Sequence, residues 1–372
     1  MDKPIVLFLI DGLQVGGAER SLLETARRLI HFSPVVCVLS DSLALLPEFQ
    51  KSEIRVISFP LPRNYRFANN AKRLLKLVRE IQPDLIHSFL FHSDMILRYL
   101  PVSIPKITGL VSNSYAPRRL NQLSWKVRLK VKILKLWDKS TAKYIDLFIS
   151  NSQVIKTAYT NQLGIPAYKI KVIPRGRDLG RFGKLRKEHT ATKTFISVGR
   201  LIPSKGFDEL VRAFAELRKK YPDIKLIIAG EGPERFRLEQ VIHSLGLTNS
   251  VILSGTIQNI EDLFSAADFF VFPSHYEGLP GALIEAMLSR APIICSDIPE
   301  NKECVDESMV LFHQVGDQTD LLVKMDQALT LTDWKLRTQR AYDYAAEHFE
   351  IARIVKEYEN TYLVLLKTKN SF

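Results

Sequence analysis

Short apolar runs alternate with amphipathic stretches along the first half of the chain. The runs that we expect to form buried strands cover residues 5–10, 35–39, 55–59, 84–88, 106–111 and 147–150. Stretches in which apolar residues recur at helical spacing lie between them, as at residues 69–81. This alternation predicts a parallel sheet with helices on both faces, whose ligands bind beyond the carboxyl ends of the strands.

A second series of the same kind occupies the rest of the chain. Its expected strands cover residues 195–199, 226–229, 251–253, 268–272, 292–296 and 309–312, and a helical segment runs from 334 to about 366. The sequence V-I-P-R-G-R-D and the polar run 184–193 mark the crossing between the two series. We therefore predict an α/β fold with two doubly wound, Rossmann-like domains, over residues 1–180 and 181–350, and a C-terminal helix over 351–372.

The composition is that of a globular protein. Apolar residues make up 46% and charged residues 25%, and no apolar run reaches the roughly 18 residues that a membrane-spanning helix needs. The first apolar run ends at Asp11, too early for a signal peptide, so we expect no export. The three cysteines indicate buried core residues rather than a disulfide or metal set, and a cytoplasmic location is the simplest expectation.

Positive charge is concentrated in the first half. Residues 1–182 hold 29 Lys and Arg against 13 Asp and Glu, a balance of +16, whereas residues 183–372 hold 23 against 27, a balance of −4. A basic half of this kind can bind an anionic surface, a nucleic acid or another polyanion. Nucleic acid is disfavoured because the basic run lacks the spaced aromatic platforms of single-strand binders.

The segment 118–139 holds eight of these cations and one acid, together with Leu, Val, Ile and two Trp. On a helix, one apolar stripe contains Leu120, Leu123, Val127, Val131 and Leu134. A basic stripe beside it contains Arg128, Lys132, Lys135 and Lys139. Alternation over 126–133 also fits a strand, but the length favours a helix. A basic helix with Trp125 and Trp137 is typical of contact with an anionic membrane, and a helix packed on the sheet with a solvated basic face is the alternative.

Two carboxylates bracket a turn in the second half. The strand expected at 268–272 is broken by Pro273, and Pro280 stands where the first turn of a helix tolerates a missing N–H. Glu277 is therefore expected in the loop after the strand, and Glu285 about a turn into the helix. Free N–H groups around 278–281 would lie at the positive end of the helix dipole, a suitable position for a phosphate or diphosphate.

Two other strand-to-helix loops carry candidate anion ligands. Arg200 and Lys205 follow the strand expected at 195–199, and they can converge on a diphosphate. Gly16 and Gly17 join the first strand to the first helix, where backbone N–H groups can approach a bound group closely. Their spacing is not that of a dinucleotide fingerprint, which disfavours a nicotinamide cofactor.

The motif E-G-L-P-G-A-L-I-E-A-M closely resembles the signature of glycosyltransferase family 4, retaining enzymes with the GT-B fold, in which two Rossmann-like domains face a central cleft. The resemblance places the transferred sugar beside Glu277 and the nucleotide ribose on Glu285. It assigns the leaving diphosphate to Arg200 and Lys205, which stand in the matching motif G-R-L-x-x-x-K-G. It also assigns nucleotide-sugar contacts to the loop residues Gly230, Gly232, Gly278, Leu279, Pro280 and Gly281.

The same resemblance implies where the acceptor contacts lie. The sequence G-G-x-E-R at Gly16, Gly17 and Glu19 matches a family motif near the diphosphate and acceptor. His87 and His92 are expected at the edge of the cleft, and Asn113 stands where many relatives place a histidine. Two residues depart from the family pattern, namely Arg175 in place of Asn and Arg290 in place of Gly.

We therefore expect a retaining glycosyltransferase that moves a sugar from a nucleoside diphosphate to a glycan or lipid-linked acceptor. No D-x-D motif or His cluster suggests a metal, and two cations with a helix dipole can neutralise the leaving group without one. By resemblance, the last helix crosses back to the first domain. A GT-B glycan phosphorylase or α-glucan synthase is the enzymatic alternative, and a non-enzymatic polyanion-binding protein is the remote one.

Overall fold

The computed structural model describes residues 3–121, 123–182 and 192–370, so most of the predicted linker 184–193 lies outside the described residues. The chain divides into two compact units. Unit 1 contains the residues up to Gly176 together with the C-terminal helix, and unit 2 is Arg177–Glu350.

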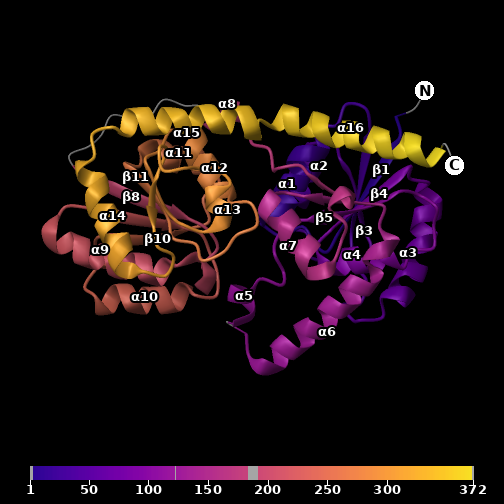
Figure 1. Ribbon diagram of the computed structural model, residues 1–372, viewed down its shortest axis with the longest axis horizontal. Helices are drawn as coiled ribbons and strands as arrows, with labels where there is room; N and C mark the ends of the chain where they lie inside the picture. The colour runs from indigo at the N-terminus through magenta and orange to yellow at the C-terminus, as the bar shows by residue number, and fades with distance from the viewer. Residues whose placement is uncertain (1–2, 122, 183–191, 371–372) are drawn as a thin grey trace. The chain divides into compact units, whose positions relative to one another are not determined.

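Unit 1 is built on a seven-stranded parallel sheet with the order β3-β2-β1-β4-β5-β6-β7 (Figure 1). Its strands are β1 (Ile5–Ile10), β2 (Ser33–Val38), β3 (Arg55–Ser58), β4 (Leu85–Phe89), β5 (Lys106–Leu110), β6 (Leu147–Ser150) and β7 (Ile170–Val172). The first six overlap the predicted runs. The apolar pattern does not predict β7, because this strand is short and the exposed Lys171 interrupts it.

Helices cover both faces of this sheet. They are α1 (Gly17–Ala26), α2 (Leu46–Lys51), α3 (Phe67–Ile81), α4 (Phe91–Arg98), α5 (Pro117–Asn121), α6 (Trp125–Thr141), α7 (Gln153–Leu163) and α16 (Ile351–Asn370). Alternate residues of β1 point to opposite faces, as a pleated strand requires. Leu7 packs in a core with α3 and α4, whereas Phe8 packs in a second core with α1 and α16.

The C-terminal helix is part of unit 1 (Figure 1, yellow). Tyr362 is fully buried, and the carboxylate of Glu359 accepts hydrogen bonds of 2.6 Å from the backbone N–H groups of Ile30 and His31. The helical segment predicted from residue 334 is two helices, α15 (Trp334–Phe349) and α16, because Glu350 between them has an extended backbone.

Unit 2 contains a six-stranded parallel sheet with the order β10-β9-β8-β11-β12-β13. Its strands are β8 (Thr194–Val198), β9 (Lys225–Ala229), β10 (Val251–Gly255), β11 (Phe269–Phe272), β12 (Ile293–Ser296) and β13 (Leu311–His313). Its helices are α8 (Leu179–Phe182), α9 (Phe207–Lys220), α10 (Arg235–Ser244), α11 (Ile260–Ala266), α12 (Gly281–Leu288), α13 (Pro299–Lys302), α14 (Gln318–Thr330) and α15 (Trp334–Phe349). All six strands overlap predicted runs.

Both sheets share one winding pattern. Counted from its first strand, each has the order 3-2-1-4-5-6, and unit 1 adds a seventh strand at the edge. The strand order reverses between β1 and β4 in unit 1 and between β8 and β11 in unit 2, and ligands of doubly wound sheets bind at such switch points. No helix among the described residues is long and apolar enough to cross a membrane.

Candidate active site

The candidate site of unit 2 lies at the carboxyl edge of its sheet. β8 is paired in parallel with β9 on one side and β11 on the other, so the loops that follow these three strands leave from the same edge. Arg200 and Lys205 follow β8, Gly230 and Gly232 follow β9, and Glu277 follows β11. The switch point therefore brings together motifs that are far apart in the sequence.

Gly230 and Gly232 allow the loop after β9 to contact the loop after β8. Gly230 has φ +147°, and a Cβ there would lie 1.9 Å from the carbonyl oxygen of Gly199. A Cβ on Gly232 would lie 2.3 Å from the carbonyl oxygen of Leu201. Larger residues would push the two loops apart, so in this structure both glycines serve loop packing, whatever contact their backbone makes with a nucleotide.

The loop after β11 is fixed from three sides. Ser296 Oγ donates a hydrogen bond of 2.5 Å to the carbonyl oxygen of Ser274. The backbone N–H of His275 donates to the carbonyl oxygen of Ser204, at 2.8 Å, and its ring Nε2 lies 2.8 Å from a carboxylate oxygen of Glu209 on α9. Because Ser204 precedes Lys205, the backbone ties the loop of Glu277 to the loop of Lys205.

Lys205 and Glu277 form an ion pair. Lys205 Nζ lies 2.5 Å from Glu277 Oε1, and the two side chains are 18% and 12% exposed. The ammonium group also lies 5.4 Å from the ring centre of Phe272, the last residue of β11. The cation predicted from one motif and the carboxylate predicted from another are therefore in direct contact.

Glu285 is paired with a residue that the sequence did not point to. Arg177 Nε donates to Glu285 Oε1 at 2.8 Å. A Cβ on Gly281 would lie 2.3 Å from Nη2 of Arg177, so the guanidinium lies against the first residue of α12. A cation at the positive end of a helix is unfavourable without a nearby anion, and Glu285 supplies one. Arg177 stands in the charged sequence R-G-R-D, which interrupts the apolar pattern, and this interruption is the signal that could have identified it.

Helix α12 begins one residue later than predicted. Gly281 is its first residue, and Pro280 precedes the helix as its N-cap. Leu279 and Pro280 are buried, so their side chains pack in the protein rather than face a ligand. The N-cap residue Pro280 makes no side-chain hydrogen bond to this end, and Arg200 is exposed and makes no ion pair within the described ranges. The N-terminus of α12 and the guanidinium of Arg200 therefore give this part of the site a positive potential.

In unit 1, the glycine loop follows β1, and Gly16 is the N-cap of α1. The carboxylate of buried Glu19 lies against Gly16, where a Cβ would be 2.3 Å from Oε2. A Cβ on Gly17 would be 2.8 Å from Nη1 of Arg175. Arg175, one of the two departures from the family pattern, also donates to the carbonyl oxygen of Val111 at 3.4 Å. It therefore links the ends of β7 and β5 to the glycine loop.

His87 does not lie at an edge, which corrects the prediction. It is fully buried in β4, its Nδ1 lies 2.8 Å from the hydroxyl of Tyr362, and its ring is 4.2 Å from that of Phe89. Burial lowers the pKa of His87 to about 3. The residue is a neutral packing group between the sheet and α16, where an acceptor sugar has no access.

His92 lies in the first turn of α4, directly after β4. The backbone N–H groups of His92 and Ser93 donate to the carboxylate of Asp11, at 3.3 and 2.7 Å. Burial lowers the pKa of His92, and the Asp11 carboxylate partly offsets this. Asp11 directly follows β1, so both side chains lie at the switch point of unit 1, and Asp11 was not among the residues predicted for the site.

Asn113 lies in the loop 111–116, which is joined to α6. Its side-chain oxygen accepts a hydrogen bond of 3.2 Å from the N–H of Tyr115. The hydroxyl of Tyr115 donates to Asp138 at 2.6 Å, and Asp138 also pairs with Arg98 at 2.6 Å, with both side chains of the pair buried. The loop predicted to contact the acceptor is therefore fixed to α6 by a buried polar network.

The predicted basic helix is interrupted. α5 ends at Asn121 and α6 begins at Trp125, so the stripe through Leu120 and Leu123 does not continue onto α6. Of the four predicted membrane contacts, Arg128 instead donates to the carbonyl oxygens of residues 120, 121 and 123, and Lys135 lies 5.8 Å from the ring of Tyr115. Lys132 and Lys139 are exposed.

Trp137 also corrects the prediction. Its Nε1–H donates to the hydroxyl of Tyr99 at 2.6 Å, and its ring packs edge-on against Phe67. It therefore anchors α6 to unit 1 and does not face solvent as Trp125 does. Within the described residues, no group of three or more His, Cys, Asp or Glu has metal-ligand geometry.

Both halves of the chain match glycosyltransferase families. Residues 15–181 match Glycosyltransferase Family 4, and residues 183–348 match Glycosyl transferases group 1. An uncharacterised glycosyltransferase of Methanocaldococcus jannaschii is 31% identical over 64% of this chain and 61% of its own length. The capsular polysaccharide biosynthesis glycosyltransferase CapH of Staphylococcus aureus is 25% identical over 80% of this chain and 82% of its own.

Two further proteins are similar over most of their length. The UDP-Gal:alpha-D-GlcNAc-diphosphoundecaprenol alpha-1,3-galactosyltransferase of Escherichia coli is 25% identical over 87% of each chain. The structure of Anabaena HepE in complex with UDP and glucose superposes with a TM-score of 0.80 and 22% identity, over 96% of this chain and 99% of that one. At this identity the structural match establishes a shared fold, which confirms the predicted GT-B architecture.

Proposed function

The chain belongs to the GT-B glycosyltransferases of family 4, and we propose that it is a retaining enzyme acting on a UDP- or GDP-linked sugar. The proposed acceptor is a hydroxyl of a lipid-linked glycan in the synthesis of a cell-surface polysaccharide or glycolipid. The observation that carries the proposal is the Lys205–Glu277 pair, in which two separate motifs converge at the switch point of unit 2.

The chemistry requires charge stabilisation on both sides of the breaking bond. The sugar becomes cationic as its bond to phosphate breaks, and negative charge develops on the diphosphate. In our proposal, Arg200, Lys205 and the N-terminus of α12 hold the diphosphate. Glu277 holds the sugar, and Glu285 holds the ribose. Lys205 would shift from Glu277 toward the diphosphate when the donor binds, which frees the carboxylate for the sugar.

The proton of the acceptor hydroxyl also needs a base. We propose that an oxygen of the leaving diphosphate takes it on the face where the sugar–phosphate bond breaks, so that the sugar keeps its anomeric configuration. Two cations and a helix N-terminus supply the positive charge for this leaving group, and the proposal therefore includes no metal. Activity should survive EDTA, and a strong loss restored by a divalent cation would contradict this part of the proposal.

The acceptor and the location are proposed from relatives. The Escherichia coli relative acts, by its name, on a diphosphoundecaprenol-linked sugar, and the Staphylococcus aureus relative belongs to capsular polysaccharide synthesis. We extend this class of acceptor to the present chain and place it at the inner face of the cytoplasmic membrane. The charge balance of +16 over residues 1–182 suits an anionic surface.

A panel of nucleotide sugars would test the donor. The donor should raise the melting temperature of the protein, because a ligand that binds the folded state stabilises it. Nucleoside diphosphate should then be released rapidly only when a lipid-linked acceptor is added. Formation of a sugar 1-phosphate from a glycan and inorganic phosphate would indicate a glycan phosphorylase instead, and no stabilisation by any nucleotide sugar would refute the proposed donor class.

Two substitutions should separate the roles of the carboxylates. Glu277→Ala should lower kcat by about 100-fold or more with little change in KM, because the charge of Glu277 matters mainly in the transition state. Glu285→Ala should raise the KM for the nucleotide sugar as well. Exposed Glu216 on α9 offers a matched control, since Glu216→Ala removes a carboxylate of the same unit away from the site. Near-normal turnover of both site variants would show that the site is misplaced.

A further inference from the structure

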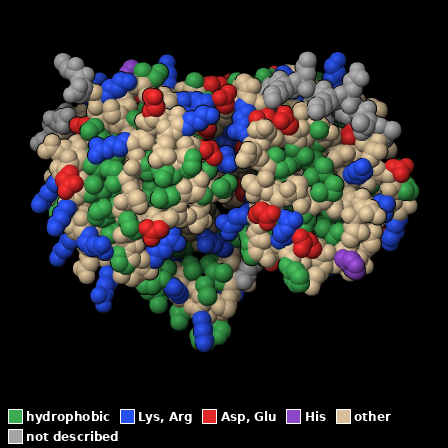
Figure 2. Space-filling view, turned by 180° about the vertical axis from the view of Figure 1, so that it is seen from behind, with side chains coloured by type: hydrophobic (Ala, Val, Ile, Leu, Met, Phe, Trp, Pro, Cys, Tyr) green, Lys and Arg blue, Asp and Glu red, His purple; other side chains and the backbone are tan. Residues whose placement is uncertain are grey.

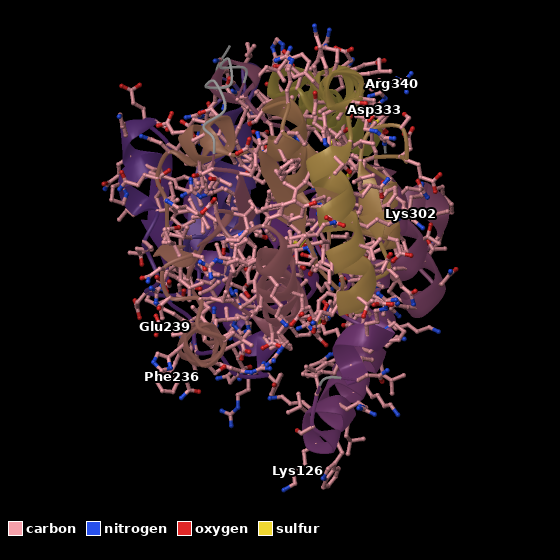
Figure 3. The ribbon with its side chains drawn as sticks, turned by 90° about the vertical axis from the view of Figure 1, so that its left-hand side faces the viewer. Lys126, Phe236, Glu239, Lys302, Asp333 and Arg340 are labelled. Carbon is pink, nitrogen blue, oxygen red and sulfur yellow. The ribbon has the colours of Figure 1, made fainter. Side chains whose placement is uncertain are left out.

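The C-terminal part of helix α6 makes its buried polar contacts with unit 1, whereas nearer the N-terminus Val131 packs against the core and Lys130 Nζ lies 5.2 Å from the ring centre of Tyr65. Asp138 bonds to Arg98 and Tyr115, and Trp137 packs on Tyr99 and Phe67. The N-terminal part projects from the unit, with Lys126 labelled near its tip in Figure 3. The side of this helix that turns away from unit 1 therefore presents a long exposed surface.

The outer face of α6 is apolar. Trp125, Leu129, Ile133 and Leu136 are 70%, 54%, 57% and 69% exposed. They follow one another at intervals of four, four and three residues, which places them on one face of a helix. Val131, which packs against the core, and buried Asp138 lie on the opposite side. The stripe predicted from the sequence, which contains Val131, therefore lies on the side opposite to this exposed apolar face, which was not predicted.

Lysines border this apolar face on both sides. Lys126 and Lys130 lie along one border, and Lys132 and Lys139 along the other, and all four are exposed. Figure 2 shows hydrophobic side chains with blue ones beside them at the lower projection of the molecule. The sole acid of residues 118–139, Asp138, is buried in its pair with Arg98. A second copy of the helix would bring like charges together, whereas an anionic surface would neutralise them.

We propose that α6 is an interfacial membrane helix whose apolar face enters the boundary between lipid headgroups and acyl chains. Trp125, Leu129, Ile133 and Leu136 lie below the lipid phosphates, and the bordering lysines extend to them. The basic stripe alone predicted electrostatic adhesion to the membrane surface. In the present proposal the lysines attract the helix to anionic lipids, and the apolar face then inserts among the lipids. A membrane-insertion surface is thereby added to the proposed function. Its purpose rests on that function, because insertion would bring the Asn113 loop to a lipid-linked acceptor.

Vesicle flotation of the full chain tests the proposal. The vesicles contain phosphatidylcholine alone or with about 30% phosphatidylglycerol, at low and high ionic strength. The double variant L129S/I133S should lower partitioning into anionic vesicles about 100-fold, at roughly tenfold per large side chain, and high salt should not abolish the difference from wild type. The matched control is V323S/L336S, which replaces two equally exposed apolar residues of α14 and α15. It should bind as wild type does.

A charge variant and a fluorescence measurement complete the test. K126Q/K130Q/K132Q should weaken binding about 100-fold at low salt, and it should approach the wild type at high salt. Tryptophan emission of the wild type should shift to shorter wavelength with anionic vesicles, and W125F should remove most of that shift, because Trp125 is the exposed tryptophan of α6.

Three outcomes would overturn the proposal. L129S/I133S could bind vesicles as the wild type does while the charge variant binds more weakly, which would indicate adhesion without insertion. The wild type could bind neither kind of vesicle. L129S/I133S could dissolve a wild-type dimer measured by sedimentation without lipid, which assigns the face to a second copy. Stabilisation by UDP or GDP should be equal in the wild type and L129S/I133S, so a failure of the donor proposal remains distinguishable from a failure at α6.

Discussion

The ion pair between Arg177 and Glu285 leads to a quantitative prediction about nucleotide binding. Arg177 Nε holds one carboxylate oxygen of Glu285 at 2.8 Å, and the two side chains are 18% and 19% exposed. In our proposal the ribose hydroxyls donate to Glu285, so the guanidinium fixes the direction of that carboxylate. We therefore expect Arg177 to act as a positioning residue, which does not itself take part in the transfer.

The magnitude follows from the geometry. Two charges about 4 Å apart interact by about 4 kcal/mol at an effective dielectric constant of about 20. Desolvation of two largely buried groups offsets part of this, and residual exposure screens some of the rest. A net coupling of about 1.5–2 kcal/mol remains, and it corresponds to a change of roughly tenfold or more in an equilibrium constant.

A double-mutant cycle measures this coupling directly. Titration calorimetry with UDP and GDP would compare the wild type with R177A, E285A and the double variant. R177A should weaken binding of the cognate nucleoside diphosphate about tenfold, raise the KM of the donor and change kcat little. E285A should weaken binding at least as much, and R177A should then add little to it. Arg177→Lys should recover part of the loss.

An exposed pair provides the control. Lys220 and Asp326 are also 2.8 Å apart, but their side chains are 62% and 36% exposed and lie on α9 and α14. Their alanine variants should leave nucleotide binding unchanged. Tighter binding in R177A would refute the reasoning, since it would mean that the guanidinium competes with the ribose. Strictly additive effects of R177A and E285A would refute it as well.

Three further predictions concern the rest of the fold. Asp138→Asn should lower the free energy of unfolding in urea by about 3–5 kcal/mol, because it leaves Arg98 charged and buried; a loss below about 1 kcal/mol would contradict this. The pKa of His87 is about 6.5 in the unfolded chain and about 3 in the folded one, so between these values only the unfolded chain binds a proton. The free energy of unfolding should therefore fall by about 2 kcal/mol from pH 7 to pH 5, and it should fall by less in His87→Gln. Arg290 has a strained backbone with φ +51°, and its guanidinium lies 3.4 Å from the ring centre of Tyr342. Arg290→Gly loses the ring contact but relieves the strain, so it should be nearly neutral, whereas Arg290→Ala loses the contact and keeps the strain, so it should lower stability by about 1 kcal/mol. Equal thermal stabilities of the two variants would contradict the assignment of strain to this backbone.

The sequence predicted the fold well because buried parallel strands leave a strong local signal. β1 and β6 begin and end where the apolar runs do, since both faces of each strand are covered. β7 was missed because a strand of three residues with an exposed lysine has no such pattern. The exposed apolar face of α6 could not be predicted either, because a hydrophobic stripe in a sequence does not reveal whether the protein or another surface covers it.

For the candidate site, the sequence predicted the loops that hold the residues but not the contacts between their side chains. Motif spacing located Glu277 and Lys205 in two separate loops, but their contact depends on the pairing of β8 with β11, which the sequence does not specify. The partner of Glu285 was missed for the same reason, since Arg177 is 108 residues away. His87 was misplaced because a histidine near the end of a strand can point inward, and only the position of α16 decides this.

The inclusion of α16 in unit 1 has a consequence for biosynthesis. Tyr362 fills a core made by the first strands of the chain, and Glu359 bonds to the backbone of Ile30 and His31. Domains generally fold as units while the ribosome extends the chain. Unit 2 can complete its core as soon as Glu350 emerges from the ribosome. Most of unit 1 is synthesised earlier, but one face of its core stays uncovered until α16 is released. A nonsense mutation near codon 350 would therefore damage the N-terminal unit, far from the truncation in sequence.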